Sequence, residues 1–285
     1  MLRTRLWMGT LLIALAIVIL LEERWFAPWY PCLFLATTAA CLLAARELVR
    51  MLDAAARPSL VVVQIGLFAI LLANWCEPLR ASGLSIGSTW FVIFGAFTAC
   101  GMGVFLLEIK NFRGPDRIVE RISSYLFIFF YLGILPSFFL QLRWRPEQAM
   151  LALALTVFVP KGNDIGAYFT GKFLTGRLLG RTPMTPLLSP KKTWQGAVGG
   201  MVASVLAAIG IASLGPILPS TWAAIGFGLT VGLAGVLGDL AESLIKRDRE
   251  TKDASSAVPG FGGVLDVIDS LLFAAPVAYI WLMPP

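Results

Sequence analysis

Residues 238–270 read GDLAESLIKRDRETKDASSAVPGFGGVLDVIDS, and they separate the last two long apolar runs of the chain. The first part of this stretch is dense in charge and the middle is rich in glycine. Two more acids, Asp266 and Asp269, follow inside the second apolar run. Only 14% of the whole chain is charged, against about 25% in a soluble domain. The concentration of charge in this one stretch therefore indicates a functional segment.

The apolar runs decide the fold class. The chain is 58% hydrophobic, and several runs approach the roughly 20 residues that a bilayer-spanning helix needs. The runs are continuous rather than alternating, which favours helices over a barrel. We expect an all-α polytopic integral membrane protein with about nine transmembrane helices. They are predicted at residues 6–21, 27–45, 58–75, 89–107, 122–142, 149–170, 195–214, 219–237 and 264–283.

The distribution of basic residues predicts the topology. Most of the 23 lysines and arginines fall at the N-terminus and in the loops after the second, fourth, sixth and eighth predicted helices. The positive-inside rule then places the N-terminus and both polar clusters on the cytoplasmic side. Glu22, Glu23 and Arg24 follow the first apolar run where a signal peptide would have small residues, so a retained helix is expected. The net charge of +6 fits loops that face anionic lipid, and we expect no nucleic-acid partner.

Two residue types narrow the chemistry. The chain has no histidine, which excludes an imidazole base, a serine–histidine triad and a histidine-ligated zinc. Its four cysteines form no Cys-x-x-Cys pair and lie in or beside apolar segments, so we interpret them as packing residues.

The charged part of the opening stretch predicts a polar helix face. On a helix, Asp239, Glu242, Ser243 and Lys246 follow one another at spacings of three and four residues. A helix that leaves the membrane with solvated charges has the same pattern. Acids followed by Lys246 and Arg247 also suit a metal–phosphate site, because oxygen ligands hold Mg²⁺ while basic side chains neutralise phosphate.

The glycine-rich part, Pro259 to Gly263, precedes the last predicted helix. Glycines let the backbone approach a ligand, and a helix N-terminus just after them favours an anion, although an ordinary turn has the same composition. Asp266 and Asp269 follow about one helical turn apart and so share a face. Acids in the first turns of a membrane helix are difficult to explain by packing.

A third polar cluster lies upstream, at residues 162–172 and 189–196. Asn163 and Asp164 fall inside the sixth predicted helix, where a charge costs at least about 2.5–3.5 kcal/mol. They are therefore expected to face a polar cavity or the membrane surface. Lys191 and Lys192 alone fit the positive-inside rule, but beside Ser189 and Asp164 they indicate a nucleotide-phosphate site.

Together these clusters resemble the phosphatidate cytidylyltransferases, or CDP-diacylglycerol synthases. That family's signature runs Ser-x-x-Lys-Arg, four residues, Lys-Asp, then Pro-Gly-His-Gly-Gly, two residues, Asp-Arg-x-Asp. The residues that match it in register are Ser243, Lys246, Arg247, Lys252, Asp253, Pro259, Gly260, Gly262, Gly263, Asp266 and Asp269. The segments 163–168 and 189–196 are also similar to the family, so the resemblance spans roughly residues 162–270, with none identified in the first five helices. Phe261 and Val267 stand where the family has histidine and arginine.

The resemblance implies that CTP and phosphatidate give CDP-diacylglycerol and pyrophosphate in phospholipid biosynthesis. The lipid phosphate would attack the CTP α-phosphorus in line, with Mg²⁺ assisting and a second metal or a monovalent ion left open. It implies a bacterial inner-membrane protein with a cytoplasmic-facing site. Residues 1–148 would be N-terminal helices and residues 149–285 the catalytic region. Small-residue surfaces on the seventh and eighth helices are compatible with a homodimer.

The resemblance also assigns roles to residues. Asp266 and Asp269 would be metal ligands, with Asp239 as a further ligand. The phosphate oxygens would be held by Lys246, Arg247 and Lys252, and Asp253 would orient the loop that carries Lys252 or a metal-bound water. The nucleotide would be enclosed by Asn163, Asp164, Ser189, Lys191, Lys192, Gly260, Gly262 and Gly263.

Three alternatives stay open at this point. A related CTP-dependent enzyme that acts on another membrane lipid would share the motifs. A secondary transporter also uses charge inside broken helices, although the sequence shows no inverted repeat and its charge gathers at one membrane face. The third alternative is a catalytically silent scaffold, and only Phe261 and Val267 suggest it.

Overall fold

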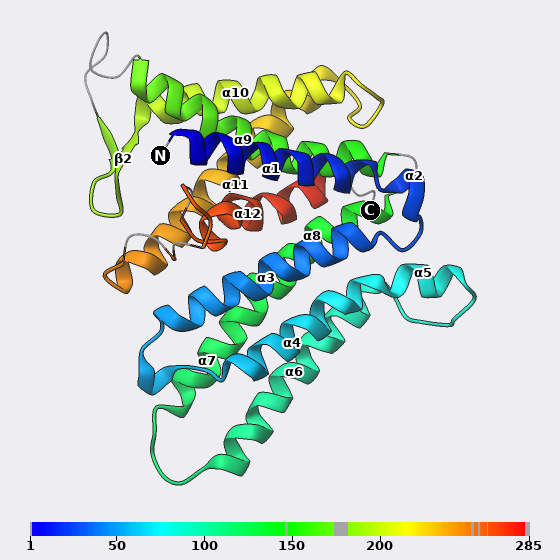
Figure 1. The fold of residues 1–285 in the computed structure, drawn as a ribbon. Helices are drawn as coiled ribbons and strands as arrows, with labels where there is room; N and C mark the ends of the chain where they lie inside the picture. The colour runs from blue at the N-terminus through cyan, green and yellow to red at the C-terminus, as the bar shows by residue number, and fades with distance from the viewer. Residues whose placement is uncertain are drawn as a thin grey trace. The chain divides into compact units, whose positions relative to one another are not determined.

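The computed structural model describes residues 2–145, 148–173, 182–251, 254–255, 257–260 and 262–282, and these are almost entirely helical (Figure 1). Among them, seven helical segments are long and apolar enough to cross a membrane: Pro31–Met51, Leu60–Ala81, Thr89–Asn111, Ile118–Trp144, Trp194–Ala212, Thr221–Asp248 and Leu265–Leu282. The prediction of an all-α polytopic membrane protein is confirmed.

The two other predicted spans are also helical. Helix α1 (Leu2–Leu21) has a shorter apolar part, Trp7–Leu21. Helix α9 (Ala149–Phe173) carries polar residues from Lys161 to Asp164 in its second half. The predicted count of about nine therefore roughly matches the structure.

The chain forms two compact units. The first comprises Met1–Leu140 and Asp253–Val267, and the second comprises Gln141–Lys252 and Ile268–Pro285. The predicted division into residues 1–148 and 149–285 concerns function and stays a prediction.

The first unit holds the N-terminal helices. They are α1, α2 (Glu23–Phe26), α3 (Pro31–Met51), α4 (Leu60–Leu72), α5 (Cys76–Ala81), α6 (Thr89–Asn111), α7 (Ile118–Phe129) and most of α8 (Leu135–Gln141). Short helical turns lie at Ala54–Ala56, Ala73–Trp75 and, at the start of the second unit, Leu142–Trp144. A π-helical turn at Phe130–Ile134 joins α7 to α8, so these two helices form one continuous span.

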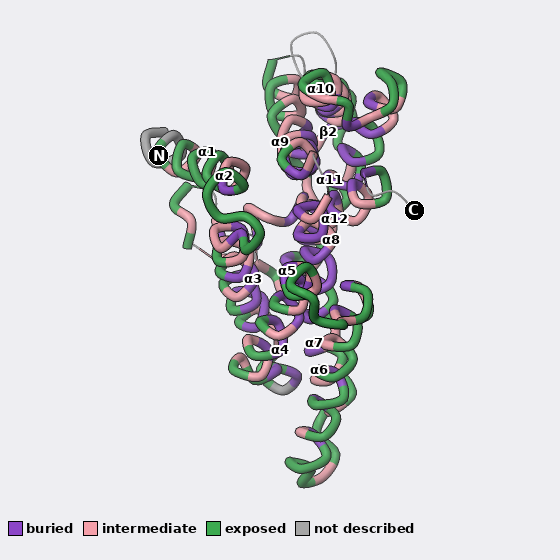
Figure 2. Tube along the Cα trace, turned by 90° about the vertical axis from the view of Figure 1, so that its right-hand side faces the viewer, coloured by how far each residue is buried: buried purple, intermediate pink, exposed green. Residues whose placement is uncertain are grey.

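Helix α4 is central to the first unit because it contacts α3, α6 and α7. Its residues Leu67 and Ile70 are fully buried, and buried residues are visible on α3 and α4 in Figure 2. Gly66 allows the close approach of α7, since a Cβ there would lie 2.5 Å from Cζ of Phe129.

The second unit holds the C-terminal helices. It contains α9, a short antiparallel hairpin of β1 (Pro183–Thr185) and β2 (Ser189–Thr193), α10 (Trp194–Ala212), α11 (Thr221–Asp248) and α12 (Leu265–Leu282) from Ile268 onward. Glycines bring α10 against α9, as expected from its small residues. A Cβ on Gly200, for example, would lie 2.6 Å from Oδ1 of Asn163. The hairpin was not predicted.

Helices α3 and α11 extend beyond their predicted ends into charged segments. Helix α3 continues to Met51 and therefore includes Arg46, Glu47 and Arg50, which the sequence placed in a loop. That expectation is wrong because Glu47 is buried, at 5% exposure, and has partners that compensate for its burial. Helix α11 likewise continues past Leu237 to Asp248, so Asp239, Glu242, Lys246 and Arg247 lie on a helix.

Candidate active site

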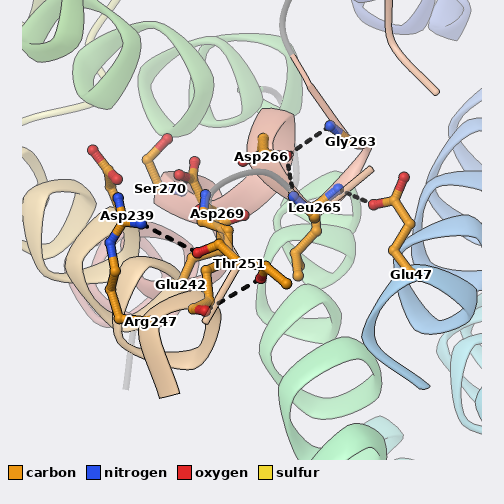
Figure 3. A network of polar contacts seen from close by, with 12 residues as sticks. Glu47, Asp239, Glu242, Arg247, Thr251, Gly263, Leu265, Asp266, Asp269 and Ser270 are labelled. Atoms are coloured by element: carbon orange, nitrogen blue, oxygen red, sulfur yellow. Dashed lines mark hydrogen bonds and ion pairs between the residues drawn. The ribbon is translucent and has the colours of Figure 1, made fainter. Parts of the chain in front are cut away.

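Three carboxylates of the second unit converge between α11 and α12. Asp239 and Glu242 lie on α11 and Asp269 lies on α12, and one oxygen from each lies within 4.8 Å of the others (Figure 3). Glu242 is 1% exposed and Asp269 is 6% exposed, while Asp239 is half-buried. We call these three residues the acidic cluster. Negative charge at this density and burial needs compensation by cations.

Glycine makes this convergence sterically feasible. Gly238 immediately precedes Asp239, and a Cβ there would lie 2.5 Å from the carbonyl oxygen of Asp269. Gly235, one turn earlier on α11, similarly faces Pro160 of α9, with a Cβ-to-Cβ distance of 2.7 Å if it were alanine. The backbone of α11 therefore passes close to α9 and α12 and brings their polar side chains together.

Three lysines of the same unit surround the acidic cluster. Lys246 Nζ lies 2.5 Å from Glu242 Oε2, and Lys192 Nζ lies 2.7 Å from Asp239 Oδ2. The third, Lys161 on α9, has its Nζ 2.8 Å from Ser270 Oγ and 3.9 Å from Asp269 Oδ1. Each carboxylate of the cluster is thus near a different ammonium group, which offsets the cost of burying it.

A cavity of about 600 Å³ opens beside the cluster. Its polar lining includes Asn163, Asp164, Lys172, Lys191, Lys192 and Asp239. Asp164 also lies 3.5 Å from Lys161 Nζ. The volume is within the range of about 300–1,000 Å³ typical of small-molecule sites, and Asp239 belongs to both the cavity and the acidic cluster.

The glycine-rich loop belongs to the first unit. Gly260 and Gly262 have φ values of 88° and 110°, which residues other than glycine rarely adopt. Asp266 holds this loop, because its Oδ2 accepts hydrogen bonds from Gly263 N at 2.6 Å and from Ala254 N at 3.2 Å (Figure 3).

The structure brings together most of the upstream predicted site residues. Within the second unit, the cavity and acidic cluster join Asn163, Asp164, Lys191, Lys192, Asp239 and Asp269, with Lys246 paired to Glu242. Ser189 lies at the start of β2. The guanidinium of Arg247 donates to the backbone carbonyls of Leu188 and Thr251, which makes it a link between β-hairpin and helix end.

The other predicted residues are placed differently or lie outside the described structure. Gly260, Gly262, Gly263 and Asp266 shape the loop of the first unit, and their roles toward a nucleotide or metal stay predictions. Lys252, Asp253 and Phe261 lie outside the described residues.

Two residues of the site were not among the predicted ones. The sequence placed Glu242 on one helix face with Asp239 but gave it no ligand role of its own, and the structure puts it in the acidic cluster. Lys161 lies within the predicted span 149–170 without a predicted role, and its partners Ser270 and Asp269 lie more than 100 residues away, near the start of α12.

Three closely spaced carboxylates, two of them buried, fit a divalent metal ion. Mg²⁺ prefers hard oxygen ligands and is commonly bound by one or two carboxylates together with phosphate oxygens. Because the neighbouring lysines suit phosphate, the described residues can hold both a metal and a phosphorylated ligand.

These features define a polytopic helical membrane protein whose C-terminal helices build a charged cavity. The chain belongs to the cytidylyltransferase family, whose sequence model matches residues 1–283. The family match thus extends over the first five helices, in which no resemblance had been identified.

Several relatives carry the name phosphatidate cytidylyltransferase. Form 4 from Arabidopsis thaliana chloroplasts is 35% identical over 188 residues, or 60% of this chain and 48% of the relative. The protein of Synechocystis sp. is 32% identical over 209 residues, covering 64% of this chain and 69% of the relative. That of Brucella suis is 36% identical over 152 residues, covering 53% and 54%. The chain thus matches about half the length of the chloroplast and Brucella relatives.

Proposed function

We propose that this protein transfers CMP from CTP to phosphatidate and releases CDP-diacylglycerol and pyrophosphate. The observation that carries the proposal is the acidic cluster of Asp239, Glu242 and Asp269, surrounded by lysines and open to a cavity of about 600 Å³. The relatives of this chain that bear the name phosphatidate cytidylyltransferase support the choice of substrates.

The transfer needs no general base. A phosphate oxygen of phosphatidate attacks the α-phosphorus of CTP, a new phosphorus–oxygen bond forms, and the bond from the α-phosphorus to the oxygen bridging to the β-phosphate breaks. Pyrophosphate leaves with that electron pair. Because the attacking phosphate is already ionised near neutral pH, a chain without histidine can carry out the reaction by positioning and charge neutralisation.

The acidic cluster is the proposed metal site. Asp239, Glu242 and Asp269 would hold Mg²⁺. The metal-ligand role of Asp266 stays a prediction from the sequence. Bound Mg²⁺ would supply Lewis-acid neutralisation of the phosphate oxygens. A second metal or a monovalent ion stays open.

The lysines are the proposed phosphate ligands. Lys192 and Lys246 already lie within ion-pair distance of the acidic cluster, and Lys191 lines the cavity beside them. Negative charge on a triphosphate and on pyrophosphate would be offset by these ammonium groups. Asn163 and Asp164 would border the nucleotide on the α9 side, while Lys252 and Asp253 keep their predicted roles in phosphate binding and loop orientation.

The membrane setting suits a lipid acceptor. The acyl chains of phosphatidate would stay in the bilayer while the headgroup reaches the cavity. We further infer a bacterial inner membrane with the site facing the cytoplasm, on the strength of the charge distribution and the bacterial relatives. A homodimer through the small-residue faces of α10 and α11 stays a prediction.

Purified protein in detergent, given phosphatidate, radiolabelled CTP and Mg²⁺, tests the proposal. We expect lipid-soluble label that requires both phosphatidate and Mg²⁺. In Asp269→Asn the label should fall by at least about 100-fold, because the cluster loses a charged ligand. Isothermal titration with Mn²⁺ gives a second readout, and the variant should bind this ion more weakly.

Other outcomes would redirect the proposal. Label that enters a different lipid, with phosphatidate inert, would favour the related CTP-dependent enzyme. If the folded protein incorporates no label into any membrane lipid, transfer from CTP is rejected. The catalytically silent scaffold, suggested by Phe261 and Val267, would then be favoured.

A further inference from the structure

Glu47 has both of its carboxylate oxygens engaged by the loop that precedes α12. Oε1 accepts hydrogen bonds from Val264 N at 3.0 Å and from Ser255 Oγ at 2.5 Å. Oε2 accepts one from Leu265 N at 2.9 Å (Figure 3). All these residues belong to the first unit. Since Glu47 is 5% exposed, these donors replace the water that a carboxylate would otherwise bind.

The position of Glu47 is electrostatically favourable. Helix α12 begins at Leu265, and the first N–H groups of a helix have no partner within the helix. A negative charge beside them also interacts favourably with the helix dipole. Glu47 therefore stabilises both the start of α12 and the loop at Ser255, although it lies on α3, 217 residues before Val264.

The same loop contains residues that the proposed reaction uses. Asp266 holds Gly263 and Ala254 from one side through its Oδ2. Glu47 also lies against Gly263, because a Cβ built on Gly263 would be 2.6 Å from Oε2 of Glu47. The conformation of the glycine-rich loop is thus fixed between two carboxylates, one from the signature and one from an N-terminal helix.

We propose that Glu47 is a positioning residue for nucleotidyl transfer. It fixes the glycine-rich loop and the first turn of α12, and through them the carboxylate of Asp266. This inference rests on the proposed function. It gives the N-terminal helices a role in the reaction that the signature motifs, all C-terminal to residue 162, do not reveal.

The test compares Glu47→Gln with a matched control, Glu22→Gln. Glu22 is also buried, at 1% exposure, and also accepts N–H bonds at a helix start, from Cys32 at 2.8 Å and Leu33 at 3.1 Å. Those bonds belong to α3 and not to the glycine-rich loop. Both variants remove one buried capping charge, so both should lower the unfolding temperature in detergent.

Turnover should separate the two variants. We expect kcat of the full-length protein with CTP, phosphatidate and Mg²⁺ to fall at least about tenfold in Glu47→Gln, because the loop residues lose their alignment. In Glu22→Gln kcat should stay within about twofold of the wild-type value. Glu47→Asp, which keeps the charge, should recover part of the activity.

Hydrogen exchange gives a readout independent of turnover. Peptides covering residues 254–266 should exchange faster in Glu47→Gln than in wild type. Their exchange rate should be unchanged in Glu22→Gln. If Glu47→Gln fails to fold, Ser255→Ala removes one of the three donors and should raise exchange around residue 255 with a smaller loss of kcat.

The outcomes distinguish this inference from the proposed function. Wild-type protein with normal exchange but no transfer rejects the proposed function and with it the positioning role of Glu47. An active wild type with equal kcat losses in Glu47→Gln and Glu22→Gln, and no selective change in loop exchange, overturns the inference while leaving the reaction intact.

Discussion

Asp266 and Asp269 lie three residues apart on one helix, yet they belong to different regions of the molecule. Asp266 faces the glycine-rich loop and binds backbone N–H groups of Gly263 and Ala254. Asp269 joins the acidic cluster of α11 and α12 and lies near the ammonium of Lys161. One carboxylate shapes a loop, and the other contributes charge to a site. Similar spacing in a signature therefore does not imply similar partners.

Substituting each aspartate in turn tests this contrast most directly. Asp269→Asn should lower CMP transfer by at least about 100-fold without changing hydrogen exchange in residues 254–266. Asp266→Asn should also lower transfer, but it should speed exchange there because its amide group is a weaker acceptor for two N–H donors. Kinetics and hydrogen-exchange mass spectrometry on the same preparations provide the measurement. Equal loosening of the loop in both variants would contradict the separation of roles.

The sequence predicted the helices well because each apolar run is continuous and long. It also placed Asp239, Glu242 and Lys246 on one helix face, since spacing rules operate within one helix. It did not predict the partners of Glu47 or Lys161. Those contacts join helices that are far apart in the chain, and no periodic pattern encodes them. Charge in an apolar run signals that a partner exists, but only the tertiary structure identifies that partner.

Gly238 offers a way to disturb the Asp269 side alone. Gly238→Ala would place a Cβ 2.5 Å from the Asp269 carbonyl oxygen and force α11 and α12 apart. We expect a loss of about 1–3 kcal/mol in stability together with weaker metal binding. Gly210→Ala on α10 is the matched control, because a Cβ there meets nothing within 4 Å. Thermal unfolding in detergent and Mn²⁺ titration measure both effects. Similar results for the two alanines would show that the close approach at Gly238 is unimportant.

Substituting Lys161 tests the same contrast through charge, and its effect should be smaller than those of the other substitutions. Its ammonium lies between Asp164 and Asp269, at 3.5 and 3.9 Å. Lys161→Gln leaves the acidic cluster more negative, so a divalent cation should bind more tightly while CTP binds more weakly. A unit charge at about 4 Å contributes about 4 kcal/mol at an effective dielectric constant of 20, and partial exposure to solvent reduces this. We therefore expect changes of about threefold to tenfold in opposite directions.

Lys172→Gln is the control for these opposite changes in cation and CTP binding. Lys172 also lines the cavity, but its ammonium lies 3.5 Å from the hydroxyl of Tyr168 and has no carboxylate partner among the described ion pairs. Its loss should raise the KM for CTP and leave the Mg²⁺ concentration for half-maximal activity unchanged. If Lys161→Gln raises the Mg²⁺ requirement, the lysine supports the metal site instead of competing with it. Asp269 would then depend on Lys161 for its orientation, much as the loop depends on Asp266.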